Sequence, residues 1–151
     1  MALVKDTLKS GILAIINSPP ATPAIAAVQW GAAYDAYAKL GMAGIIPGTF
    51  TGSEASQFAA AILPAFNNTN GTQVTAVAGF VLALTKYWMV PPVVYGVGAV
   101  TAITGLAALS TMFSTAYSSA DAAASNIATF LDTCTKTVIV TLPGPTLVTL
   151  T

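Results

Sequence analysis

The chain has 151 residues, of which 55% are hydrophobic and 7% are charged, and its mean hydropathy is +0.76. Five lysines balance five carboxylates, and the chain has no arginine and no histidine. We therefore expect no nucleic-acid partner, because such binding needs a surplus of positive charge. The composition also lacks the usual general base, the imidazole metal ligand and the guanidinium clamp for phosphate, so we expect no enzyme and no cofactor.

A neutral and apolar exterior predicts that much of the surface is covered. Charge of either sign ordinarily keeps folded monomers apart, so a surface with few ionic groups favours contact with a protein partner or with lipid. The length suits one domain that buries about 68–70% of its unfolded surface. The only cysteine, Cys134, cannot form an intramolecular disulfide and is typical of core packing.

The spacing of apolar residues predicts two helices in the first part of the chain. Residues 5–17 place apolar side chains every three or four positions, and a Pro-Pro pair follows them. Thr22 can cap a second helix that has Pro23 at its first position and ends at Gly41.

A loop over residues 44–52 precedes a third predicted helix. Thr51 and Glu54 fit a capping box, in which a hydroxyl and a carboxylate each satisfy a backbone donor at the start of a helix. The helix therefore begins at about Ser53, and Glu54 is interpreted as a cap rather than a catalytic acid. Pro64 should kink this helix because it removes one hydrogen bond.

Three more helices are predicted over residues 72–89, 99–117 and 121–134. A Pro-Pro pair ends the first of them, and an aspartate near the start of the last complements the helix dipole. Asp132 and Lys136 stand four positions apart and can form a modest helical ion pair.

The period of the pattern changes at the C-terminus. Thr137, Ile139 and Thr141 alternate with Val138, Val140 and Leu142, and this two-residue repeat rich in β-branched side chains predicts a strand. Residues 143–145, Pro-Gly-Pro, predict a turn, and residues 146–151 predict a second strand. The expected fold is mainly α: a compact bundle of about five to six helices with a short C-terminal β-hairpin or extended strand arm.

The expected organisation is a helical region over residues 1–136 and a strand arm over residues 137–151, within a single domain. An uncharged terminal strand offers free backbone groups to the sheet edge of another chain. We therefore predict a homo-oligomer whose interface includes Thr137, Val138, Ile139, Val140, Thr141, Leu142, Leu147, Val148 and Leu150. Whether these strands pair within one chain or between chains is left open.

A small integral membrane protein of pore-forming or lysis type is the alternative. Residues 87–120 carry no charge, and residues 93–113 are apolar enough to span a bilayer as a helix. The membrane-spanning unit would be a helical hairpin near residues 72–117. Against it, the lysines are scattered singly, with no basic cluster beside the candidate span.

Parts of the chain resemble small structural proteins of tailed-phage virions in overall style. The resemblance lies in Asp121-Ala-Ala-Ala-Ser-Asn-Ile-Ala through Thr135-Lys-Thr-Val-Ile-Val-Thr, and in Lys86-Tyr-Trp88 before them. It implies a non-enzymatic subunit of a tail, neck or baseplate, located in the virion and contacting identical subunits and other virion structural proteins.

Overall fold

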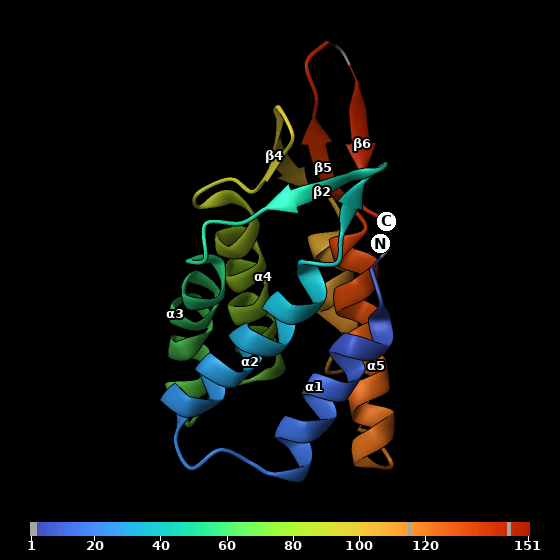
Figure 1. Cartoon of the computed structure of the whole chain (residues 1–151). Coiled ribbons are helices and arrows are strands. Elements are labelled where there is room, and N and C mark those ends of the chain that lie inside the picture. Colours follow the sequence, from blue (N-terminus) through green and yellow to red (C-terminus); the bar gives the residue numbers. More distant parts are fainter. Residues whose placement is uncertain (1–2, 115, 145) are drawn as a thin grey trace.

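The structure, a computed structural model, describes residues 3–114, 116–144 and 146–151. Helices form one end of the molecule and a small sheet forms the other (Figure 1). The elements in chain order are α1 (Lys5–Asn17), α2 (Pro23–Ala38), β1 (Met42–Ala43), β2 (Ile46–Thr49), α3 (Glu54–Asn67), α4 (Gln73–Met89), β3 (Val94–Tyr95), β4 (Gly98–Ile103), the 3-10 helix η1 (Gly105–Thr111), α5 (Ala120–Thr135), β5 (Val138–Thr141) and β6 (Leu147–Thr149).

Side-chain caps lie at the starts of α2, α4 and α5, and all five α-helices lie where helices were predicted. The hydroxyl of Thr22 accepts a hydrogen bond from the backbone N–H of Ile25 at the start of α2. Thr72 and Thr75 form a reciprocal capping box at the start of α4. The hydroxyl of Ser119 accepts a hydrogen bond from the backbone N–H of Ala122 at the start of α5, so these three helix starts satisfy backbone donors that would otherwise lack a partner.

Neighbouring helices pack side by side, in the order α5, α1, α2, α3 and α4, and η1 contacts both α4 and α5. Two glycines allow close approach between helices. A Cβ atom on Gly31 of α2 would stand 2.5 Å from the carbonyl oxygen of Ala55 on α3. A Cβ atom on Gly79 of α4 would stand 2.6 Å from the Cβ of Ala65 on α3. The backbones of α2, α3 and α4 therefore lie unusually near one another.

The helix predicted over residues 99–117 is wrong, because most of this segment forms strand β4 and helix η1. Its β-branched side chains suit an extended strand, and β4 finds its partner in β5, which is far away in the sequence. After β4, the backbone N–H of Gly105 donates to the hydroxyl of Thr137. A local reading of an apolar, charge-free segment does not reveal such a distant partner. Residue 115 of the predicted helix lies outside the described residues.

The mainly α-helical class is confirmed, but the sheet is larger than a short C-terminal hairpin. It has six antiparallel strands in the order β1-β2-β3-β4-β5-β6. Residues 42–49 and 94–103, which the pattern did not predict to be strands, supply four of them. The sheet thus combines strands from both predicted regions, residues 1–136 and residues 137–151. Residues 1–2 of the first region and residue 145 of the second lie outside the described part of the chain.

The sheet closes on itself. Ala43 of β1 forms an antiparallel bridge with Leu150, directly after β6. Beside this bridge, Met42 and Thr151 exchange two backbone hydrogen bonds, of 3.3 and 3.1 Å. The first strand is thereby joined to the last, and closure of this kind covers strand edges that would otherwise be free to pair.

An aromatic cluster fills the core. Tyr34 stacks on Phe58 with ring centroids 5.2 Å apart, and it meets Tyr87 edge to face at 4.9 Å. Trp88 and Tyr95 are fully buried beside them. These aromatic side chains, which come from α2, α3, α4 and β3, therefore serve packing.

Candidate functional site

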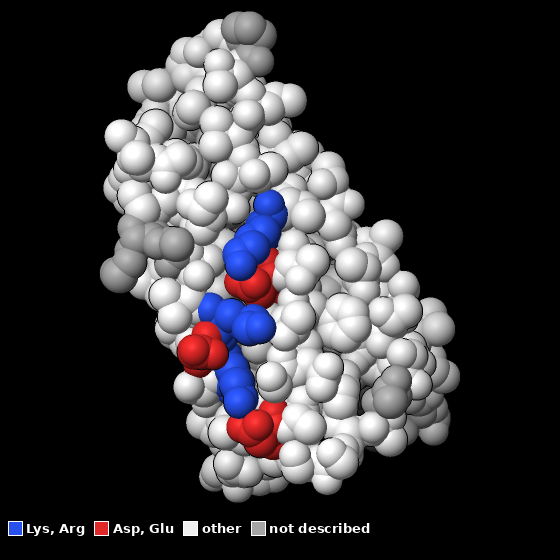
Figure 2. Space-filling model, turned by 90° about the vertical axis from the view of Figure 1, so that its right-hand side faces the viewer, with Lys and Arg blue, Asp and Glu red and all other residues white. Residues whose placement is uncertain are grey.

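The charged side chains are unevenly distributed over the surface. Helices α1 and α5 pack against each other and carry five of the ten, namely Lys5, Asp6, Lys9, Asp121 and Asp132, and a sixth, Lys136, directly follows α5. Figure 2 shows a single stripe of alternating sign on the side of the molecule that includes these helices. Lys9 contacts Asp121 at 2.8 Å, and Lys136 contacts Asp132 at 2.9 Å, which confirms the predicted pair.

The other four charged residues lie where α2, α3 and α4 approach the sheet. Asp35 and Lys39 pair at 2.6 Å at the end of α2, Glu54 is buried at the start of α3, and Lys86 is in the last turn of α4. Residues 10–34 and 55–85 contain no charged side chain. We call the outer surface of α2, α3 and α4 formed by residues 23–34 and 55–85 the neutral face.

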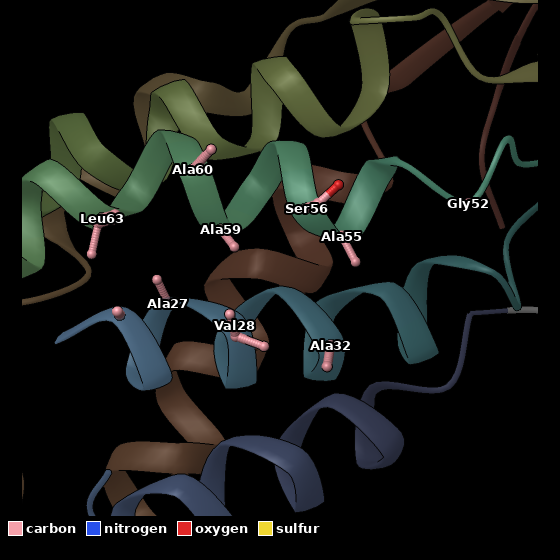
Figure 3. A pocket seen from close by; sticks show the side chains of 10 residues that line it. Ala27, Val28, Ala32, Gly52, Ala55, Ser56, Ala59, Ala60 and Leu63 are labelled. Carbon is pink, nitrogen blue, oxygen red and sulfur yellow. The ribbon is translucent and has the colours of Figure 1, made fainter. Parts of the chain in front are cut away.

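A groove runs along the neutral face between α2 and α3 (Figure 3). Its volume is about 470 Å³, and small side chains form most of its walls: Ala24, Ala27, Val28, Ala32, Gly52, Ala55, Ser56, Ala59, Ala60 and Leu63. Val28 lies at its edge and is 62% exposed. The groove can therefore accept apolar side chains without removing any ion from water.

A second groove, of about 290 Å³, lies between α3 and α4. Its lining is also small and uncharged: Ala61, Pro64, Ala65, Asn68, Thr75, Ala78, Gly79 and Leu82. Helix α3 is thus a low ridge between two grooves. Exposed aliphatic side chains accompany the ridge on α2 and α4, namely Ile25, Val28, Val74 and Leu82.

The predicted C-terminal interface residues are mostly engaged within the chain. Strand β5 pairs with β4 on one side and with β6 on the other, so the two C-terminal strands pair with each other in this structure. Val138, Val140 and Leu150 are buried, whereas Leu147 is 66% exposed. The remaining five, Thr137, Ile139, Thr141, Leu142 and Val148, are half-buried. The backbone of β5 therefore has no free edge to offer to another chain.

The buried carboxylates hold the fold together through hydrogen bonds. Asp132 accepts from the hydroxyl of Tyr37 at 2.7 Å. Glu54 accepts from the backbone N–H groups of Thr51 and Gly52 at 2.6 and 2.8 Å, and also from the Thr51 hydroxyl. Burial alone would raise the pKa of Glu54, but these donors outweigh it and hold that pKa below its usual value. The predicted role of Glu54 as a cap residue agrees with these contacts.

A chain of hydrogen bonds crosses the core. The indole N–H of Trp88 donates to the hydroxyl of Tyr34 at 2.8 Å, and Tyr34 lies 2.7 Å from the hydroxyl of Thr135. Since the Thr135 hydroxyl gives its own proton to the Leu131 carbonyl, Tyr34 must donate to Thr135. The hydroxyl oxygen of Tyr95 is buried and has no hydrogen-bond partner among the described residues.

Sequence reasoning missed the two grooves and the tyrosine contacts of the aspartates. Runs of alanine in α2 and α3 were the available signal for the grooves, because small side chains leave hollows between adjacent helices. Nothing in the sequence indicates that Tyr37 meets Asp132, because they are 95 positions apart. Within the described ranges, no cluster of three or more Cys, Asp or Glu side chains could hold a metal ion.

The helical hairpin expected near residues 72–117 for the membrane alternative is not formed. Helix α4 supplies its first half, but β4 and η1 replace the second helix. In the part of the chain that the structure describes, no helix is both long and apolar enough to cross a bilayer. Comparisons with protein-family models, curated proteins and solved structures found no match to this chain.

Proposed function

We propose that this chain is a non-catalytic building block of a protein assembly, and that its neutral face is the surface through which copies associate. The observation that carries the proposal is the segregation of charge. Residues 10–34 and 55–85 bring no ionic group to α2, α3 and α4, while α1, α5 and the residue directly after α5 hold six of the ten ions. Interface cores in proteins are depleted in charged residues in the same way.

The energetics of burial favour a protein neighbour on this face. Burying an ionic group costs several kcal/mol, of order 3–5 kcal/mol when its partner is lost, and the neutral face avoids that cost entirely. Its exposed aliphatic side chains, such as Val28 and Val74, gain free energy when they leave water. The small residues along both grooves allow a helix of a neighbour to approach closely. A second copy offers a surface with the same neutral character.

The use of the carboxylates supports a non-catalytic role. Asp35 binds Tyr87 and Lys39, Asp132 binds Tyr37 and Lys136, and Glu54 binds backbone groups. Each of these contacts joins or ends helices. Three of the five carboxylates are therefore used to stabilise the fold.

We assign the assembly to a tailed-phage particle, as a subunit of its tail, neck or baseplate. The support is the resemblance over α5 and β5 and at the end of α4. In a particle, repetition of identical subunits would supply the burial that the neutral face requires. The partners would be identical copies and other structural proteins of the virion.

Light scattering on purified protein tests the association. Val28→Glu and Ala60→Glu place a charge at exposed positions of the neutral face, and Thr133→Glu places the same charge at an exposed position on α5. The wild type and Thr133→Glu should form oligomers, and the first two variants should form markedly smaller species. A wild type that stays monomeric at every concentration would overturn the proposal.

Immunogold electron microscopy tests the assignment to a particle. Antibodies against the chain should label the tail, neck or baseplate of phage particles from a lysate that contains it. Particles that carry no label, beside a positive control for a known tail protein, would remove the virion assignment while leaving self-association in place.

A further inference from the structure

The seam between β6 and β1 is one of the short junctions of the closed sheet, like those between β1 and β2, β2 and β3, and β3 and β4. It consists of one bridge, Ala43 with Leu150, and the two backbone hydrogen bonds between Met42 and Thr151. By comparison, β5 shares four register pairs with β4 and three with β6. The seam also joins the last residues of the chain to a strand of only two residues.

Few side chains anchor β6. Leu147 is 66% exposed and Thr149 is exposed, whereas Leu150, directly after the strand, is 2% exposed. The neighbouring strand β5 has two fully buried side chains, Val138 and Val140. Strand β6 is therefore held by its backbone hydrogen bonds and by two side chains, the half-buried Val148 and the buried Leu150, and an identical strand from another copy can supply the same contacts.

Nothing in the strands around β6 opposes its replacement by another strand. Natural sheets protect their edges with charges and prolines, and the described residues of β1, β5 and β6 contain neither. If β6 left its place, the freed edges of β1 and β5 would both be open to pairing. The connection from β5 to β6 contains Gly144, whose positive φ of 93° makes it a ready point for redirecting the chain.

The geometry points to exchange of β6 between copies of this chain: the strand of one copy fills the place between β5 and β1 of its neighbour. The occupant follows from identity, because a second copy's β6 makes the same backbone bonds and buries the same Leu150. Such exchange of an identical element is a low-cost route to association. This inference rests on the proposed self-association and adds the element that links neighbouring copies.

A cysteine pair across the seam distinguishes the two arrangements. Residues that exchange both backbone hydrogen bonds have Cα atoms about 5.5 Å apart, which suits a disulfide. Met42→Cys with Thr151→Cys would be oxidised in the assembled protein and analysed on a non-reducing gel. The matched control is Ala102→Cys with Ile139→Cys on β4 and β5, a register pair that remains within one chain in both arrangements.

Exchange predicts that most of the seam variant migrates as covalent dimers or larger species that a reductant returns to monomer, while the control stays monomeric. Cross-linked monomers in a sample that light scattering shows to be oligomeric would overturn exchange and leave the proposed function intact. Cross-linked monomers without any oligomer would overturn both. A seam variant that forms no disulfide, while the control does, also overturns the inference, because β6 would then not be seated on β1 of any copy.

Discussion

The hydroxyl of Tyr37 donates a hydrogen bond of 2.7 Å to Oδ1 of Asp132, and Lys136 contacts Oδ2 of the same carboxylate at 2.9 Å. The same arrangement occurs a second time, where Asp35 accepts from the hydroxyl of Tyr87 and pairs with the lysine four positions later. The first unit joins α2 to α5, and the second joins α4 to α2. These two units connect three helices through buried phenol groups.

Replacing Tyr37 with phenylalanine should destabilise the protein. Asp132 is only 7% exposed, so loss of the hydroxyl leaves one carboxylate oxygen with neither its donor nor full access to water. We expect the free energy of unfolding to fall by about 1–3 kcal/mol, measured by urea denaturation. Tyr117→Phe is the control, because Tyr117 is half-buried and water can replace its contact with the Met112 carbonyl. Equal losses in the two variants would contradict this account.

Local and distant interactions explain which parts of the structure could be predicted. The cap at Thr22 and the ion pair of Asp132 with Lys136 involve neighbours in sequence, and both were predicted from the local sequence. The partner of Asp132 is Tyr37, on a different helix, and no spacing rule identifies it. The same limit applies to the fold class, because β4 is a strand only through its pairing with β5. The sequence of β4 has no charged residue, so it lacks the regular spacing of polar residues that distinguishes a strand from a helix.

The hydrogen-bond chain through Tyr34 gives a second stability prediction. Thr135→Val keeps the shape of the side chain but removes the acceptor of the Tyr34 proton, in a position where water cannot enter. The free energy of unfolding should fall by about 1–3 kcal/mol. Thr133→Val, an exposed change on the same helix, should alter it by less than about 0.5 kcal/mol. If Thr135→Val left the free energy of unfolding unchanged, the hydrogen bonds through Tyr34 would contribute no stability.

The buried tyrosines make the folded state sensitive to alkali. Burial raises the pKa of Tyr34, Tyr37, Tyr87 and Tyr95 above the ordinary value of about 10. Because the folded pKa is raised, their contribution to stability is complete below about pH 10 and is lost as the pH rises further. Phenolate absorbance and circular dichroism, followed together, should change in one cooperative step. Ionisation of these tyrosines near pH 10 with unchanged circular dichroism would refute the prediction.

Glu54 gives the opposite dependence at acid pH. Since its folded pKa is lowered, its contribution is present above the unfolded value of about 4.3 and is lost as the pH falls through the folded pKa. Glu54→Gln should therefore be less stable than the wild type at neutral pH, by about 1–3 kcal/mol. The difference should shrink below about pH 4. A difference that does not change with pH would show that charge at Glu54 is not what stabilises the start of α3.

The neutral face depends on the close approach of α2 and α3 at Gly31. Alanine there gains about 1 kcal/mol of helix propensity, but its Cβ would stand 2.5 Å from the carbonyl oxygen of Ala55. That oxygen belongs to the backbone of α3 and can move only with the helix, so overpacking should cost about 1–3 kcal/mol and outweigh the gain. We expect Gly31→Ala to lower the thermal midpoint and, by separating the walls of the groove, to weaken association in light scattering. A higher thermal midpoint with unchanged association would mean that the two helices can move apart freely and that their spacing does not shape the surface.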